Sequence, residues 1–102
     1  MRDPKSSAPV ERIEQAILLI RSKKVILDRD LAKLYGVETR VLNQAVQRNI
    51  ERFPDDFMFA LTREEIMRIS QIVTSSKIKY SKRVYAFTEQ GVAMLSTIFV
   101  VQ

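Results

Sequence analysis

Apolar residues recur at helical spacing near the start of the chain, three or four positions apart, with charged residues on the opposite side. These apolar residues are Val10, Ile13, Ala16, Ile17 and Ile20. The pattern predicts a first helix over residues 10–21. Residues 1–9 carry two prolines, two serines and no apolar period, so we expect a flexible leader before that helix.

Three short apolar runs further along predict β-strands, because turn residues or charges bound them. They are residues 25–27, 57–61 and 84–87. The other stretches show helical periods, with apolar positions at Leu31, Leu34 and Tyr35, at Val41, Leu42, Ala45 and Val46, at Ile66 and Ile69, and at Val92, Ala93, Leu95, Ile98 and Phe99. The pattern predicts one α+β domain over residues 10–102, with about five helices and a small three-stranded sheet.

Several helix starts carry a residue suited to satisfying free backbone N–H groups. Asp28 is expected to cap the helix that follows the first strand. Thr62 and Glu65 have the spacing of a capping box, in which each side chain bonds the other residue's amide. Thr88 is expected to cap the last helix, where Gly91 would permit close packing.

The chain has neither cysteine nor histidine, which excludes disulfides and thiolate zinc sites and removes the commonest metal ligand. Its net charge of +5 favours a polyanionic partner, either nucleic acid or an anionic membrane surface. No apolar run is longer than that of residues 16–20, which is too short to span a bilayer, and the N-terminus lacks the apolar segment of a signal peptide. We therefore expect a cytoplasmic protein without a cofactor.

Two pairs of adjacent carboxylates raise the alternative of a metal-dependent nuclease, since paired carboxylates can hold Mg²⁺. Asp55 and Asp56 lie in a segment with the composition of a turn, residues 53–56. Glu64 and Glu65 lie at a predicted helix start. We expect structural roles for both pairs, no bound metal and no enzymatic activity.

The segment DRDLAKLYGVETRVLNQAVQRN, residues 28–49, has the features of a helix-turn-helix unit. Ala32 supplies the small residue needed where two helices cross, and Gly36 supplies a residue tolerant of positive φ four positions later. Val37 can fill the corner. The shared core is expected to contain Leu31, Tyr35, Leu42 and Ala45 or Val46. Since such units also occur in proteins that never touch DNA, this segment favours DNA binding without establishing it.

If the apolar side of the second helix of this unit, residues 39–49, points inward, five polar residues point outward. They are Arg40, Asn43, Gln44, Gln47 and Arg48. Arginine pairs with guanine through two hydrogen bonds, and asparagine or glutamine does the same with adenine. We expect these five residues to read base edges in the major groove. The alternative is a polar surface helix whose amides are incidental.

Six further residues are expected to contact the DNA backbone: Lys33, Thr39, Lys77, Lys79, Lys82 and Arg83. Thr39 begins the second helix, where its hydroxyl would either cap the helix or bind a phosphate. Residues 77–83 are basic, include Tyr80 and precede a predicted strand. They form either a wing-like loop over the DNA backbone or a solvated surface loop, and the sequence favours neither.

Four segments together resemble the KilA-N-like domain of phage and bacterial proteins, of the "ORF-six N-terminal" type. They are DLAKLYGV, LNQAVQRN, RFPDDFMFAL and AFTEQGVAML, and the resemblance covers residues 10–97. It implies a DNA-binding module, often fused to a variable C-terminal domain in antirepressor-type regulators, and it carries over Asn43 and Arg48 as functional. The tail IFVVQ is apolar where relatives tend to turn charged, so we expect a domain excised from a longer protein.

The function expected from these observations is that of a sequence-specific, non-catalytic DNA-binding domain of a phage- or prophage-type transcriptional regulator. The alternative is a protein–protein interaction module that uses the same helix pair to contact another regulator. The expected partner is double-stranded DNA rather than a membrane or a small molecule. Whether the domain forms a homodimer stays open, although helix-turn-helix units usually bind two-fold sites as dimers.

Overall fold

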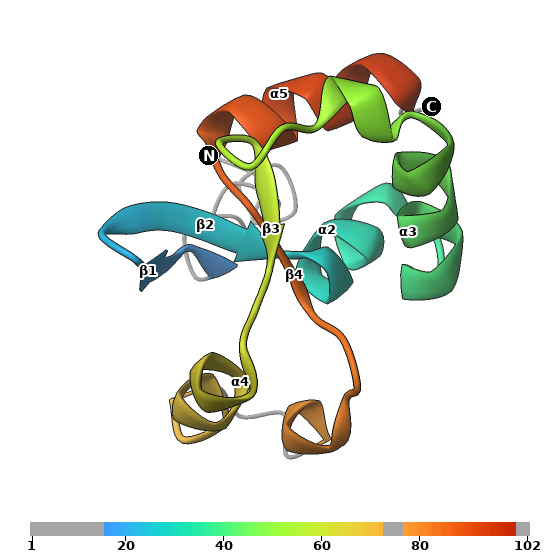
Figure 1. Ribbon diagram of the computed structural model, residues 1–102. Coiled ribbons are helices and arrows are strands. Elements are labelled where there is room, and N and C mark those ends of the chain that lie inside the picture. The colour runs from blue at the N-terminus through green and yellow to red at the C-terminus, as the bar shows by residue number, and fades with distance from the viewer. Residues whose placement is uncertain (1–15, 73–76, 100–102) are drawn as a thin grey trace, which may run out of the picture.

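The computed structural model describes residues 16–72 and 77–99 (Figure 1). A four-stranded antiparallel sheet runs in the order β1-β2-β4-β3, formed by β1 (Leu18–Ile20), β2 (Lys23–Leu27), β4 (Tyr85–Phe87) and β3 (Met58–Ala60). The helices are α2 (Asp28–Tyr35), α3 (Thr39–Arg48), α4 (Arg63–Ser70) and α5 (Glu89–Ile98), with 3₁₀ turns η1 (Ile50–Arg52) and η2 (Ile78–Tyr80). The predicted α+β class is confirmed, but the predicted counts differ: the described residues form four helices and a four-stranded sheet instead of about five helices and three strands, because β1 forms where helix was predicted.

The predicted helix over residues 10–21 is wrong at its C-terminal end, where β1 pairs with β2. Leu18 lies opposite Val25, and Ile20 lies opposite Lys23. Along β1 the side chains alternate, since Leu19 is 74% exposed whereas Ile20 is buried. Leu18, Leu19 and Ile20 are all apolar, so this short run is compatible with the period of a helix and with that of a strand. Pairing with β2 makes it a strand. The leader at 1–9 and the predicted helix at 10–15 lie outside the described residues.

The sheet separates two hydrophobic cores, because successive residues of its strands point to opposite faces. Leu27, Phe59 and Ala86 belong to the first core, with residues of α4 and η2. Their neighbours Ile26, Met58 and Phe87 belong to the second, with residues of α2, α3 and α5. In Figure 1, α4 and η2 accordingly lie on one side of the strands and the other three helices on the other side.

Two of the predicted helix caps are present, at the starts of α4 and α5. Thr62 and Glu65 form the predicted capping box, and the Thr88 side chain accepts a hydrogen bond from the Gly91 amide at the start of α5. Asp28 is not a cap: Leu27 holds the N-cap position, and Asp28 is the first residue of α2. Its carboxylate is drawn inward by hydrogen-bond donors from other elements, which are described with the candidate interface below.

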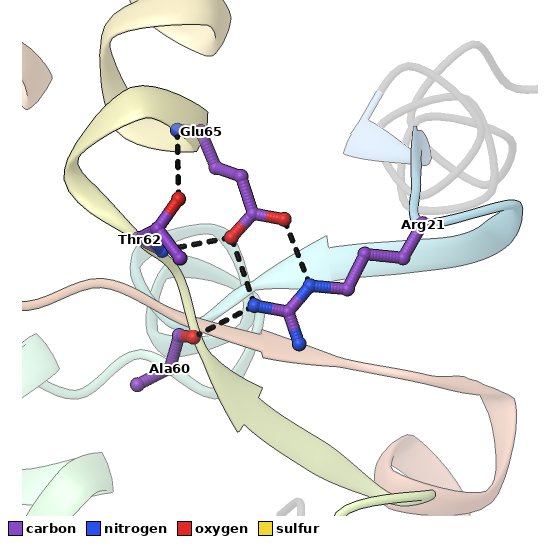
Figure 2. A network of polar contacts seen from close by, with 4 residues as sticks. All are labelled: Arg21, Ala60, Thr62 and Glu65. Carbon is purple, nitrogen blue, oxygen red and sulfur yellow. Dashed lines mark hydrogen bonds and ion pairs between the residues drawn. The ribbon is translucent and has the colours of Figure 1, made fainter.

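The turn between β1 and β2 is held to the start of α4 by an ion pair (Figure 2). Arg21 Nε and Nη2 donate to the Glu65 carboxylate at 2.8 and 2.9 Å, and the guanidinium lies over the Phe59 ring at 4.2 Å from the ring centre. Arg21 and Ser22 both have positive φ, as in the two-residue hairpin turns that match strand twist. Since neither residue is glycine, this ion pair helps to hold a strained turn.

The Arg21 hydrogen bonds lower the pKa of Glu65 to about 2, with a further contribution from the Thr62 amide. A carboxylate with a lowered folded-state pKa stabilises the fold above its unfolded value of 4.5, and this contribution disappears as the pH falls toward 2. Glu65→Gln keeps the capping box and removes the charge. We expect it to lower the free energy of unfolding by about 1–2 kcal/mol at pH 7.

Urea unfolding of both proteins between pH 7 and pH 2 measures this effect. The gap between wild type and Glu65→Gln should close between about pH 4.5 and pH 2. Glu64→Gln is the matched control, because Glu64 is exposed and no ion pair involves it among the described residues. A Glu65→Gln gap that stays constant down to pH 2 would show that the ion pair does not stabilise the fold.

The two glycines predict a contrast in stability. A Cβ at Gly91 would lie 1.9 Å from the Phe57 carbonyl oxygen, whereas a Cβ at Gly36 would meet nothing within 4 Å and would only strain a residue with φ +70°. We expect Gly91→Ala to cost about 3 kcal/mol or more, because backbone must move. Gly36→Ala should cost about 1–2 kcal/mol. Chemical unfolding of both variants checks the order, and equal losses would contradict it.

Candidate nucleic-acid interface

The helix pair α2 and α3 is joined by a three-residue turn, residues 36–38. Gly36 adopts the left-handed conformation, and the Val37 amide donates to the Ala32 carbonyl at 3.0 Å, which closes the end of α2. The predicted packing is confirmed for the buried residues Leu31, Ala32, Leu42 and Val46. Tyr35 and Ala45 are half-buried, whereas Val41, which was expected to point inward, is 36% exposed.

The outer side of α3 is open over most of its length. Four of the five residues predicted to read bases are exposed: Arg40, Gln44, Gln47 and Arg48. The fifth, Asn43, is half-buried. A groove of about 490 Å³ is lined by all five together with Arg83 and Tyr85, which come from the start of β4 and the residues before it. The structure therefore brings the five residues together around one groove, with a second wall formed by Arg83, which was predicted to contact the DNA backbone, and by Tyr85, which was not predicted.

Asp28 forms the junction behind this groove. It is completely buried, and its carboxylate accepts hydrogen bonds from three donors: the Arg29 amide at 2.7 Å, Asn43 Nδ2 at 2.9 Å and the Tyr85 amide at 3.4 Å. Asn43 lies on α3 and Tyr85 begins β4, so one carboxylate links both walls of the groove to the start of α2. An ionised carboxylate only accepts hydrogen bonds, which suits a site where three donors converge.

The charges around the groove are mainly positive. Arg40, Arg48 and Arg83 line it, and no acidic side chain does. Arg83 Nη1 donates to the Tyr85 hydroxyl at 3.3 Å, and this bond raises the pKa of Arg83 further above its ordinary value. Glu38 contacts Arg40 at 3.4 Å, but both side chains are about two-thirds exposed, so this ion pair is weak. The groove therefore suits an anionic partner that carries hydrogen-bond acceptors.

Three of the residues predicted to contact the DNA backbone lie apart from the groove. Lys77, Lys79 and Lys82 lie in or beside η2, which packs against α4 on the opposite side of the sheet from α3 (Figure 1). Ile78 is buried in the first core, and Arg63 donates hydrogen bonds to the Ser81 and Lys79 carbonyls. In its described part this segment is therefore an anchored turn, and only Arg83 of the four basic residues reaches the groove.

The other two predicted backbone contacts lie on the helix pair. Lys33 is exposed in the last turn of α2. Thr39 is half-buried and is the first residue of α3, whereas Glu38 holds the N-cap position. No side chain caps α3. The capping role considered for the Thr39 hydroxyl is therefore wrong, since a cap must precede the first helical residue.

The two pairs of carboxylates lie at a helix start and in a turn. Glu65 is bound to Arg21 and to the Thr62 amide, while Asp55 and Asp56 lie in a turn in which the Phe57 amide donates to the Pro54 carbonyl. Within residues 16–72 and 77–99, no group of three or more potential metal-ligating side chains comes together.

Sequence reasoning missed two residues of this interface, Asp28 as the junction and Tyr85 as part of the second wall. The one sequence feature that sets Asp28 apart is that it is an acidic residue directly after the apolar run 25–27. No local signal marked Tyr85, because its place in the groove results from strand pairing.

Comparison with known proteins gives a family and no nearer relative. The model of the ORF6N domain matches residues 15–98, which is most of the chain. No curated protein and no solved structure matches it. None of the helices in the described ranges is long and apolar enough to cross a membrane. The extent of the match shows that the chain belongs to the ORF6N domain family.

Proposed function

We propose that this chain is a sequence-specific domain for double-stranded DNA, in which α2 and α3 act as a helix-turn-helix unit and α3 enters the major groove. The observation that carries the proposal is the open side of α3, where Arg40, Gln44, Gln47 and Arg48 are exposed around a groove with no acidic lining residue. Arginine and glutamine are the residue types that pair with guanine and adenine edges.

The rest of the groove supplies the charge that DNA binding requires. Arg83 faces the same space from the strand side, so both walls of the groove carry cations. The chain as a whole carries a net charge of +5. Phosphate contacts position a protein on the duplex, while contacts to base edges specify the sequence. Arg83 and, beside the turn, Lys33 and Thr39 are the residues we assign to the backbone.

The resemblance to KilA-N-like domains supports a biological setting for the proposal. We propose a phage- or prophage-type transcriptional regulator of the antirepressor type, which acts in the bacterial cytoplasm without catalysis. The competing function, a protein–protein interaction module, would use the same exposed helix side but would not need its guanidinium groups to meet phosphates.

Salt dependence separates these two functions. With Arg83 and Lys33 each neutralising one phosphate, affinity for a random duplex should fall roughly tenfold between about 50 and 200 mM salt, because bound counterions are released on binding. Fluorescence anisotropy with a labelled duplex measures this loss. Binding that is unchanged by salt, or absent at low salt, would contradict DNA binding and favour the interaction module.

Three alanine variants test which cations read bases and which contact the DNA backbone. A preferred site is first selected from a random DNA pool. Arg48→Ala should lose about 1–3 kcal/mol on the selected site and relax the preference at one base pair. Arg83→Ala should weaken binding to all sequences by the same factor. Lys79→Ala is the matched control, since it removes one cation away from the groove and should change neither property.

Binding assays on the selected site and on its single-base variants give both quantities. If Lys79→Ala weakens binding as much as Arg83→Ala does, the DNA lies on the η2 side of the domain and the proposed interface is wrong.

A further inference from the structure

The five polar residues of α3 are not equivalent, because the Asn43 side chain is hydrogen-bonded to the buried carboxylate of Asp28. Its Nδ2 donates to Asp28 Oδ2 at 2.9 Å. The opposite orientation of the amide would set its oxygen against a carboxylate oxygen, so the charge of Asp28 fixes which atom faces it. The remaining atom, Oδ1, is buried and has no hydrogen-bond partner among the described residues.

Reading an adenine takes both ends of an asparagine amide, since the oxygen accepts from N6 and the nitrogen donates to N7. With Oδ1 buried, Asn43 can present this pair of atoms only by leaving Asp28. Asp28 would then keep the Arg29 amide at 2.7 Å, the ion pair with Arg29 Nε at 3.6 Å and the long contact to the Tyr85 amide at 3.4 Å. Removing a donor from a fully buried carboxylate is strongly unfavourable, which keeps Asn43 in place.

We propose that Asn43 is a positioning residue, which fixes α3 against the start of β4 through Asp28, and that Arg40, Gln44, Gln47 and Arg48 alone read bases. This inference rests on the DNA-binding function proposed above. The four readers span eight helical steps of 1.5 Å, about 12 Å, which corresponds to roughly 3–4 base pairs. The DNA recognised by α3 is therefore a short block with guanines facing the two arginines at its ends and adenines facing the glutamines between them.

The experiment uses the whole chain and a site selected by the wild type from a random duplex pool. Affinities of Asn43→Ala and Gln44→Ala are measured for that site and for each of its single-base variants, below the unfolding temperature of each protein. The Asn43→Ala variant should bind every sequence with an affinity about three- to tenfold lower than the wild type, and it should keep the ranking of sites. Gln44→Ala should lose about tenfold on the selected site and its preference at one A·T pair.

Asn43→Ser supplies the second variant, which also serves if Asn43→Ala does not fold. A serine hydroxyl ends one bond nearer the backbone than the asparagine amide, so it can donate to Asp28 through a bridging water, but it cannot bridge the two atoms of an adenine edge. It should restore most of the affinity and the full ranking of sites, a rescue that a base-reading role does not allow.

Loss of preference at a single base pair in Asn43→Ala or Asn43→Ser would overturn the inference and leave DNA binding intact. The inference is also overturned if the wild type binds duplexes in a salt-dependent way but selects no preferred block. Absence of binding even at low salt would instead overturn the proposed function itself.

Discussion

The buried carboxylate of Asp28 is the constraint on which the candidate interface depends. It joins the start of α2, the middle of α3 and the start of β4, through the Arg29 amide, the Asn43 side chain and the Tyr85 amide. A buried charge is tolerated only when donors surround it, so these elements cannot shift independently. The exposed side of α3 is thereby held at a fixed position relative to Arg83, as a surface that reads a rigid duplex requires.

The sheet gives this junction its support by dividing the domain into two packed halves. The half that contains α2, α3 and α5 carries the groove, while the half with α4 and η2 is tied to the β1–β2 turn through Arg21 and Glu65. Gly91 lets α5 approach the Phe57 carbonyl, so the last helix completes the second core together with the helix pair. The charges of the half with α4 and η2, including Lys77 and Lys79, are consequently separated from the groove.

Local patterns predicted the elements whose structure depends on neighbouring residues. The period of α3, the glycine after α2 and the Thr62–Glu65 box all follow from spacings of four residues or fewer, and all are present. The hairpin at β1 could not be predicted in this way, because its turn lacks glycine and asparagine and is held by Glu65, 44 positions away. The role of Asp28 as the junction could not be predicted for the same reason, since its carboxylate accepts a hydrogen bond from the Tyr85 amide, 57 positions away.

The central claim is that DNA bases meet the exposed amides of α3, and the side-chain NH₂ signals of an isotope-labelled sample report on this directly. In a nuclear magnetic resonance titration with a selected duplex, the account predicts the largest side-chain amide shifts at Gln44 and Gln47. Backbone shifts should concentrate on α3 and on Arg83 and Tyr85. Shifts confined to α4 and η2, with the two glutamine amides unmoved, would contradict the account.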